Sequence, residues 1–458
     1  MVLMNQIVAH QQSFFQSNAT KNVAFRIEQL KKLERVLKEN EHLLNTAIFS
    51  DFKKSEFDNY TTELGIIYSE INTACNKLHT WARTKKVTTN FLNFPGKSYI
   101  IPEPLGVTLI IGAWNYPYQL SISPAIAAIA AGNTVILKPS EISVATSALL
   151  AQIINNTFDP AIFKVVEGGV PETTELLNQK FDKIFFTGST TVGKIVYQAA
   201  AKHLTPVTLE LGGKSPVIID KTCNLKICVK RLVWAKFLNA GQTCIAPDYV
   251  CVDASIKTEF LKQLTLEITA SNFKIENSNY VQIINEKNMK RIISLIDTEK
   301  IYLGGTFNFE ETTIEPTVLT DVSFNDKIME DEIFGPILPI ITYNNIDEII
   351  VQIKLKPKPL ACYIFSNNNA FIKKIEKEIS FGSGAINDAI MQISNQNLPF
   401  GGVGESGIGS YHGEYGFKAF SHYKSILKKS TWFEPNLKYF PLTDLKLKII
   451  KFLMNFKL

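Results

Sequence analysis

The stretch VTLIIGAWNYPYQLSISPAIAAIAAGNTVILKP (residues 107–139) places two short apolar runs on either side of a segment of helical composition. Neither run alternates with polar residues, which is typical of strands that are covered on both faces. The same rhythm continues through FKVVEG, KIFFTG and VTLELGG, as far as residue 213. Strand-like runs that alternate with helical segments indicate βαβ units and a parallel sheet.

The segments before and after this block complete the expected architecture. The first eighty residues repeat apolar positions at helical spacing, as in VAFRIEQLKKLERVLKENEHLLNTAIF. After Gly213, a second set of apolar runs (VIID, DYVCVD, ILPIITY, ACYIFS and GAIN) again alternates with helical segments. The sequence therefore predicts two consecutive α/β domains with a cleft between them.

The composition is that of an ordinary globular protein. Of the 458 residues, 45% are hydrophobic and 20% are charged, and the net charge of +5 gives no reason to expect a nucleic-acid partner. The N-terminus lacks the features of a secretory signal and no stretch is long and apolar enough to span a bilayer. We therefore expect a cytoplasmic protein with reduced thiols.

The six cysteines fit neither a disulfide framework nor a zinc site. Their spacing is irregular, and Cys223 and Cys228 lack a second Cys or His pair at zinc-site spacing, so no metal is expected. We expect packing roles for Cys75, Cys223, Cys228, Cys251 and Cys362.

Two glycine loops resemble phosphate-binding motifs. Gly188–Lys194 fits G-x-x-x-x-G-K, but Ile195 follows where a P-loop needs Ser or Thr, which argues against an ATPase. This loop could still hold a diphosphate at the start of a helix over 190–202, or it could be an ordinary turn. A literal G-x-G-x-x-G at 402–407 lacks the strand and helix context, and we expect a flexible loop there.

Three polar residues follow strand-like or turn-like stretches where ligands commonly bind. Glu210 ends a strand before two glycines, and Asn115 follows the turn that leaves the strand at Gly112. Cys244 follows NAGQT, a turn-forming stretch that could expose the thiol near hydrogen-bond donors. Taken singly, a structural role is the favoured interpretation of each of these residues.

Together the motifs resemble those of the NAD(P)-dependent aldehyde dehydrogenases. LELGGKSP and GQTC are similar to that family's glutamate and cysteine signatures, and WNYP, LKPSE, FTGSTTVGK, EIFGP and LPFGGVGESGIGSYHG occur in the family's order. WNYP and YHG resemble the class-3 or fatty-aldehyde branch, which implies a homodimer and a medium-chain, long-chain or otherwise lipophilic aldehyde.

The resemblance implies a fold of two parallel-sheet α/β domains with a small β oligomerisation extension. Residues 1–80 and 100–207 would form the NAD(P)-binding domain, and residues 208–393 the catalytic domain. Residues 81–99 and 394–435 would bridge and oligomerise, and residues 436–458 would form an amphipathic tail.

The same resemblance implies a mechanism. The Cys244 thiolate would attack the aldehyde, and the Asn115 amide and the Cys244 backbone N–H would hold the oxyanion. After hydride transfer to the nicotinamide, Glu210 would activate water to hydrolyse the thioester. The alternatives are a CoA-acylating dehydrogenase, against which Glu210 argues, and a catalytically silent binding protein of the same fold.

The resemblance also implies a dinucleotide site. Lys138 and Glu141 would meet the adenosine ribose, and Glu332 would hold the nicotinamide ribose. Glu141 would repel a 2′-phosphate, which favours NAD over NADP without excluding NADP. We expect a structural hydrogen bond from His412. The cofactor-binding residues implied are Trp114, Lys138, Glu141, Gly188, Ser189, Gly193, Gly212, Glu332 and Phe334.

The C-terminal stretch LTDLKLKIIKFLMNFKL (442–458) predicts an amphipathic helix. Its apolar face would comprise Leu445, Ile449, Phe452, Leu453 and Phe456, with Lys448, Lys451 and Asn455 on another face. We favour a docked terminal helix, in one version a lid over the substrate mouth, over contact with a membrane surface.

Overall fold

The computed structural model describes residues 4–455. The chain divides into two compact units, which are described separately. The larger unit comprises the chain up to Trp81 together with Pro104–His422. The smaller unit comprises Ala82–Glu103 together with the chain from Tyr423 on.

The first sheet of the larger unit is built from the apolar runs that the sequence singled out. It has six strands in the order β17-β7-β6-β3-β4-β5, all parallel except β17, which pairs antiparallel with β7. Every residue of β3, β4 and β6 is buried, which explains the absence of polar alternation. The strands are β3 (Val107–Ile111), β4 (Thr134–Lys138), β5 (Phe163–Val165), β6 (Lys183–Thr187), β7 (Val207–Glu210) and β17 (Gly407–Ile408).

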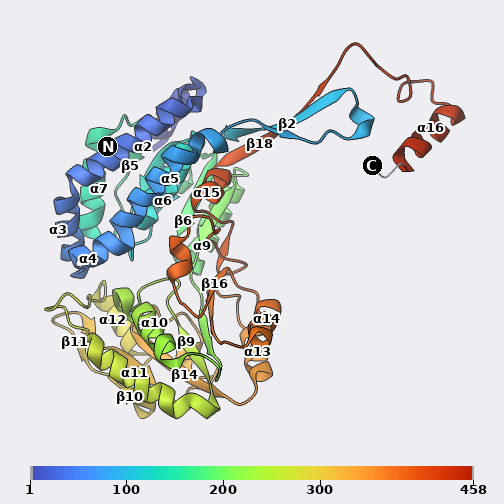
Figure 1. Cartoon of the computed structure of the whole chain (residues 1–458). Coiled ribbons are helices and arrows are strands. Elements are labelled where there is room, and N and C mark those ends of the chain that lie inside the picture. The colour runs from blue at the N-terminus through green and yellow to red at the C-terminus, as the bar shows by residue number, and fades with distance from the viewer. Residues whose placement is uncertain (1–3, 456–458) are drawn as a thin grey trace. The chain divides into compact units, whose positions relative to one another are not determined.

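Helices cover this sheet (Figure 1). Most of α6 (Gln119–Ala131) is buried, so it forms an internal helix that contacts β3 and β4. The helical N-terminal region that the sequence predicts comprises α1 to α5. The remaining bounds are α1 (Met4–Gln16), α2 (Val23–Glu39), α3 (Glu41–Phe52), α4 (Glu56–Asn59), the π-helical turn η2 (Tyr60–Leu64), α5 (Gly65–Trp81), α7 (Val144–Thr157), α8 (Val170–Leu177), α9 (Thr190–Ala201) and α15 (Gly413–Ala419).

The second sheet has seven strands in the order β10-β13-β14-β9-β8-β15-β16, parallel except for the edge strand β10. Its strands are β8 (Pro216–Ile219), β9 (Tyr249–Asp253), β10 (Ile301–Leu303), β13 (Thr317–Leu319), β14 (Ile337–Tyr343), β15 (Ala361–Phe365) and β16 (Ser383–Ile386). Its helices are α10 (Leu225–Phe237), α11 (Lys257–Ser271), α12 (Glu286–Ile293), α13 (Ile346–Lys354) and α14 (Asn369–Glu378), and β11 (Phe307–Asn308) with β12 (Thr313–Ile314) forms a separate hairpin. The predicted class of two parallel-sheet α/β layers is confirmed.

β7 belongs to the first sheet, which therefore extends to Glu210. One feature differs from the sequence-based expectation. The glycine segment 402–407, expected to be a flexible loop, leads into β17, whose Gly407 pairs with Glu210. A side chain at Gly407 would place its Cβ 2.5 Å from the Leu209 carbonyl oxygen, so only glycine permits this close approach. The division into domains stays a prediction.

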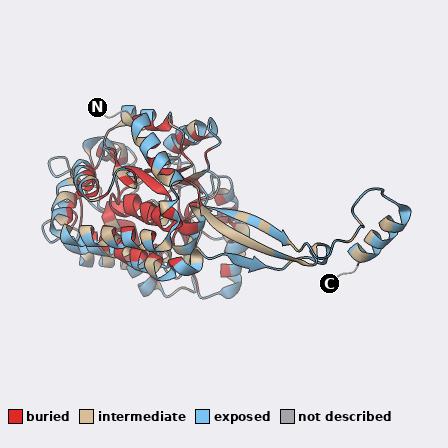
Figure 2. Cartoon of the chain, turned by 90° about the horizontal axis from the view of Figure 1, so that it is seen from above, coloured by how far each residue is buried: buried red, intermediate tan, exposed pale blue. Residues whose placement is uncertain are grey.

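The smaller unit contains a three-stranded sheet in the order β1-β2-β18 and a terminal helix. The strands are β1 (Lys85–Val87), β2 (Gly96–Pro104) and β18 (Ser421–Lys429), with Lys424 paired to Glu103 at 3.0 Å. Few of its residues are buried (Figure 2).

The C-terminal helix α16 (Asp444–Asn455) has no buried residue. Leu445 and Phe452 are 68% and 63% exposed, whereas Phe456 of the expected apolar face lies outside the described residues. Among residues 4–455, no helix is long and apolar enough to cross a membrane.

Candidate active site

A cleft of about 520 Å³ lies where the strands of the first sheet end and where loops of the second sheet approach them. Gly112, Lys138, Gly188 and Glu210 reach it from the carboxyl ends of β3, β4, β6 and β7, which is where open α/β sheets bind ligands. Cys244 lines the same cleft. Its other lining residues from the predicted set are Trp114, Asn115, Glu141, Ser189, Gly212, Glu332 and Phe334.

The loop that carries Cys244 is tightly fixed. After α10 the chain reverses through three consecutive left-handed residues, Asn239, Ala240 and Gly241, with φ angles of 54°, 51° and 72°. The Gln242 side chain donates to the carbonyl oxygens of Asn239 and Gln282, both at 3.1 Å, and accepts from the Ile284 backbone N–H at 3.0 Å. The residue Cys244 is half-buried at the cleft. It is therefore held in position and is not part of a core.

The Cys244 thiol is protonated at neutral pH in this state. Burial raises its pKa to about 12, and the nearby carboxyl groups of Glu332 and Glu210 add to the effect. Backbone N–H groups at positions 244 and 245 lower the pKa, as the turn led us to expect, but their effect is smaller. Forming a thiolate here therefore requires a proton acceptor close by.

Hydrogen bonds join the Asn115 turn to the Cys244 loop. The Asn115 side-chain amide donates to the Gln242 carbonyl oxygen at 3.0 Å, and the Asn239 amide donates to the Asn115 carbonyl oxygen at 3.0 Å. Next to them, the hydroxyls of Tyr116 and Thr243 lie 2.6 Å apart. A primary amide has two N–H groups, so the bond to Gln242 leaves the second N–H of Asn115 for a ligand.

A buried ion pair fixes the start of α6 directly after this turn. Glu63 accepts hydrogen bonds from the backbone N–H groups of Tyr118 and Gln119, at 2.8 and 3.2 Å. Its other oxygen accepts from Lys54 at 2.8 Å, and both side chains are at most 2% exposed. A carboxylate at a helix N-terminus is favoured by the helix dipole, so this pair stabilises the turn that presents Asn115.

Glu210 is a buried carboxyl group without a protein partner. It is 3% exposed, and neither of its carboxyl oxygens has a hydrogen-bond partner among residues 4–455. Burial raises its pKa well above the usual value for Glu. Burial therefore makes the Glu210 carboxylate a stronger base than an exposed glutamate, which suits a general base.

The first-sheet side of the cleft suits a dinucleotide. Gly188 and Ser189 precede α9, whose N-terminal N–H groups favour a diphosphate. Lys138 is buried and forms an ion pair at 2.5 Å with Glu141, which is 45% exposed. The two side chains are therefore not a pair that is fully exposed to solvent. Gly193 does not line the cleft, but a Cβ there would lie 2.7 Å from Leu211, so it allows α9 to pack closely.

The opposite side of the cleft is formed by the loop around Glu332. Phe334 has a φ of 47° and its ring meets Trp114 edge-on at 5.3 Å. Burial and the nearby Asp248 raise the pKa of Glu332 to about 8. A Cβ at position 212 would lie 1.9 Å from a Glu332 carboxyl oxygen, so the Glu332 carboxyl group can occupy this position only because residue 212 is a glycine.

Sequence reasoning missed the residues that hold this loop. Arg291 on α12 lines the cleft and donates to the carbonyl oxygens of Ile333 and Glu332, at 2.8 and 3.4 Å. Asp248, paired with Lys214, accepts from the Ile333 backbone N–H at 3.0 Å. No motif marks these positions, because their role depends on contacts between distant segments. Thr173 and Asn288 also line the cleft without a sequence signal.

No group of three or more His, Cys, Asp or Glu side chains in the described part of the chain is arranged to hold a metal ion. The six cysteines are all free.

A cysteine, a buried glutamate and an amide line one cleft, and the N-terminus of α9 beside them suits a diphosphate, which is an arrangement typical of cofactor-dependent dehydrogenases. The Aldehyde dehydrogenase family model matches residues 3–426, and the chain belongs to this family. It therefore oxidises an aldehyde to a carboxylic acid with NAD(P)+.

Relatives support this assignment over nearly the whole chain. The 4,4'-diaponeurosporen-aldehyde dehydrogenase of Staphylococcus aureus is 45% identical over 98% of this chain and 99% of its own. Aldehyde dehydrogenase family 3 member A2 of Mus musculus is 45% identical over 98% of this chain and 94% of its own. The solved structure described as the substrate-bound state of Staphylococcus aureus AldH has a TM-score of 0.95 and 45% identity, and covers 99% of this chain and 100% of that one.

We predict that replacing Glu63 by Gln destabilises the protein by about 3 kcal/mol, because the buried Lys54 ammonium loses its counter-charge. Urea unfolding measures the loss. The matched control is Glu34→Gln, which removes the exposed ion pair of Glu34 with Lys38 and should change the free energy of unfolding by less than about 1 kcal/mol. Equal effects of the two substitutions would contradict the stabilising role of the buried pair.

Proposed function

We propose that Cys244 is the nucleophile, Asn115 the oxyanion donor and Glu210 the general base of the aldehyde oxidation. The observation that carries this proposal is that all three line one cleft, with Asn115 bonded to the Cys244 loop. The thiol adds to the aldehyde carbonyl, and its proton has two acceptors on hand, the carboxyl groups of Glu210 and Glu332. The second amide N–H of Asn115 and the Cys244 backbone N–H bind the resulting oxyanion.

The cofactor site proposed here uses Trp114, Lys138, Glu141, Gly188, Ser189, Gly212, Glu332 and Phe334. NAD(P)+, when bound, supplies the hydride acceptor that turns the thiohemiacetal into a thioester. Glu210 then takes a proton from water as the water attacks the thioester carbonyl, which releases the acid and restores the thiol. The raised pKa of Glu210 suits this step, and the rate should rise with pH as its carboxyl ionises.

We predict that Cys244→Ser abolishes NADH formation with a simple aldehyde. Glu210→Gln should keep a rapid burst of NADH and lose about a hundredfold in steady-state turnover, because only hydrolysis loses its base. Stopped-flow absorbance separates the two phases. Normal steady-state turnover of the Glu210→Gln variant would show that Glu210 is not the general base. Formation of acyl-CoA when CoA is added would favour a CoA-acylating enzyme.

We also propose a preference for NAD over NADP. Glu141 lies where the adenosine ribose is expected, and its carboxylate would repel a 2′-phosphate. One relative is named as dimeric and NADP-preferring, so the family alone does not decide the cofactor. The preference proposed for this chain rests on the Glu141 carboxylate, which Lys138 holds in place by an ion pair.

We predict that Glu141→Gln raises the ratio of kcat/KM for NADP to that for NAD by roughly tenfold, which corresponds to about 1.4 kcal/mol of removed repulsion. Steady-state kinetics with both cofactors measure it. Glu175→Gln on α8 is the control, since it removes the same charge from an exposed position outside the cleft. An unchanged ratio in Glu141→Gln would show that Glu141 does not discriminate between NAD and NADP.

The substrate we propose is a medium-chain, long-chain or otherwise lipophilic aldehyde. A second cleft of about 680 Å³ is lined by the apolar side chains of Phe57, Trp234, Leu238 and Met391 among others, together with charged and polar residues such as Lys230, Arg231 and Glu267. Asn239, which also lines it, bonds to Asn115 and to the loop of Cys244, so this cleft adjoins the loop. Relatives named for a diaponeurosporen aldehyde and as family 3 member A2 agree with an apolar substrate.

We propose that the C-terminal helix α16 docks against its own subunit or the partner subunit and acts as a lid over the substrate entrance. We prefer this to binding of the helix to a membrane surface. The exposed apolar side chains of α16 need a covering surface. We further propose a homodimer that uses the exposed edges of the β1-β2-β18 sheet, and a cytoplasmic location that keeps all six thiols reduced.

We predict that deleting residues 442–458 lowers kcat/KM for decanal severalfold and leaves that for propanal unchanged, because an apolar lid contacts only the longer chain. Parallel assays of the two aldehydes measure it. An unchanged chain-length preference would dismiss the lid, and flotation of the full chain with phosphatidylglycerol vesicles would favour the membrane instead.

A further inference from the structure

The chain directly after Cys244 is held by two hydrogen bonds. The carbonyl oxygen of Ile245 accepts from the Tyr363 hydroxyl at 2.6 Å. The backbone N–H of Ala246 donates to the Thr243 carbonyl oxygen at 2.9 Å. The Ile245 carbonyl and the Ala246 N–H belong to one planar peptide group, so this group is fixed at both ends.

Tyr363 is a rigid anchor for this contact. It is fully buried in the middle of β15, where it lies in register with Val217 of β8 and Ala385 of β16. A side chain on a strand that is paired on both sides holds its position more closely than one on a loop. The distance of 2.6 Å between the two oxygens is short for a hydroxyl donor, which indicates a well-formed bond.

The same hydroxyl connects the Cys244 loop to the rim of the second cleft. A tyrosine hydroxyl has one hydrogen, which Tyr363 donates to Ile245, so it accepts from the Gln392 side-chain amide at 3.2 Å. Accepting this bond polarises the hydroxyl and strengthens the bond that it donates. Met391, the neighbour of Gln392, lines the second cleft and is 46% exposed.

The segment 387–392 that carries these residues has a fixed shape. Ile390 is β-branched and buried, yet its φ is 66°, a conformation that such a residue adopts only when its surroundings enforce it. Arg231 donates to the Asn387 carbonyl oxygen. Asn387 and Ser366 exchange two hydrogen bonds between side chain and backbone, both at 2.9 Å.

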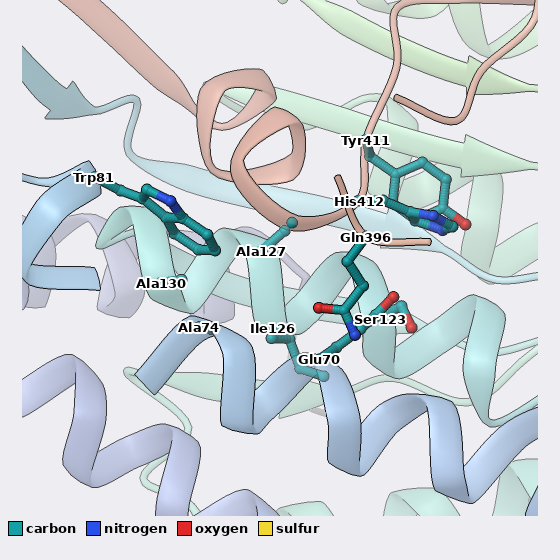
Figure 3. A pocket seen from close by; sticks show the side chains of 11 residues that line it. Glu70, Ala74, Trp81, Ser123, Ile126, Ala127, Ala130, Gln396, Tyr411 and His412 are labelled. Atoms are coloured by element: carbon teal, nitrogen blue, oxygen red, sulfur yellow. The ribbon is translucent and has the colours of Figure 1, made fainter. Parts of the chain in front are cut away.

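Burial of a tyrosine does not by itself secure a hydrogen bond. The Tyr411 hydroxyl has no hydrogen-bond partner among residues 4–455, although Tyr411 is buried beside Glu70 and His412 around a small pocket (Figure 3). The structural hydrogen bond expected from His412 is also not formed within this range, and the ring instead stacks on Phe400 at 5.2 Å. The two bonds of the Tyr363 hydroxyl therefore reflect its particular place beside the Cys244 loop.

We propose that Tyr363 is a positioning residue for Cys244, which aligns the backbone N–H groups of the Cys244 loop with the sulfur and ties this loop to segment 387–392 at the second cleft. The inference rests on the proposed role of Cys244 as the nucleophile. Neither Tyr363 nor Gln392 contacts the reacting carbon.

The alignment matters because the N–H groups of Cys244 and Ile245 lower the pKa of the thiol. Only the two rotatable backbone angles of Ile245 separate its N–H from the carbonyl that Tyr363 fixes. Without this bond the carbonyl turns more easily, and the N–H groups are less well aligned with the sulfur and with an oxyanion. The carboxyl groups of Glu332 and Glu210, which raise the same pKa, are not altered by a change at Tyr363.

The test measures alkylation of Cys244 by iodoacetamide, followed by peptide mass spectrometry, and the NADH burst with NAD+ and decanal. Tyr363→Phe removes the hydroxyl and keeps the ring. Alkylation should slow about tenfold at each pH from about 7 to 9, as expected when the thiol pKa rises by about one. The burst should slow about tenfold while KM for NAD stays unchanged, because the cofactor site is not touched.

Gln392→Leu tests the connection to segment 387–392. It should slow alkylation in the same direction by about threefold, because the Tyr363 hydroxyl loses the donor that polarises it. Added to Tyr363→Phe, it should have no further effect, since the hydroxyl through which it acts is absent. Full additivity of the two losses would contradict the connection.

Tyr343→Phe is the matched control. The Tyr343 hydroxyl donates to the Ile219 carbonyl oxygen at 3.0 Å in the same sheet, and Tyr343 lines neither cleft. Alkylation of Cys244 and the burst should stay unchanged in this variant. Equal losses in Tyr343→Phe, or none in Tyr363→Phe, would overturn the proposal.

If Tyr363→Phe failed to fold, unaltered alkylation in Gln392→Leu would overturn the proposal in its place. The alkylation assay needs no turnover, so it is independent of the proposed function. NADH formation that persists in Cys244→Ser would count against the proposed function alone.

Discussion

The arrangement of the site depends on a few hydrogen bonds between backbone and amide groups of two distant turns. The Asn115 amide reaches the Gln242 carbonyl, and the Asn239 amide reaches back to Asn115 and to Gln242. One turn follows β3 of the first sheet and the other lies between α10 and β9 of the second, so these bonds fix the spacing between the Asn115 amide and the Cys244 loop. The buried Lys54–Glu63 pair holds one side of this contact and the left-handed residues 239–241 shape the other.

Burial then sets the chemistry of the acidic groups. Glu210 and Glu332 have raised pKa values for the same physical reason, which is the loss of hydration of the charged form. The thiol of Cys244 is affected in the same direction. The cleft therefore favours the protonated forms of its acidic groups, and the proposed mechanism requires these protons to be moved during turnover.

Much of this was predictable from local sequence, and the rest depended on tertiary contacts. Continuous apolar runs such as VTLII and KIFFT predicted strands buried on both faces, and the structure places them in a parallel sheet. The glutamate and cysteine motifs predicted residues that do share a cleft. Arg291 and Asp248 gave no signal, because each acts through backbone groups about 40 or more residues away. The hydrogen bond expected from His412 is not formed to any of residues 4–455, and its ring instead stacks on Phe400, a tertiary contact that the local sequence does not reveal.

The nearly complete burial of α6 has a consequence for the engineering of this fold. A helix packed on all sides, with Pro124 inside it and the Glu63 carboxylate at its start, has no free surface along which it can adapt. Changes of specificity should therefore be sought on the rim of the second cleft, where Phe57, Trp234 and Met391 are 76%, 44% and 46% exposed. If the substrate enters through this cleft as proposed, variation there should alter which aldehydes are accepted and leave the buried interior unchanged.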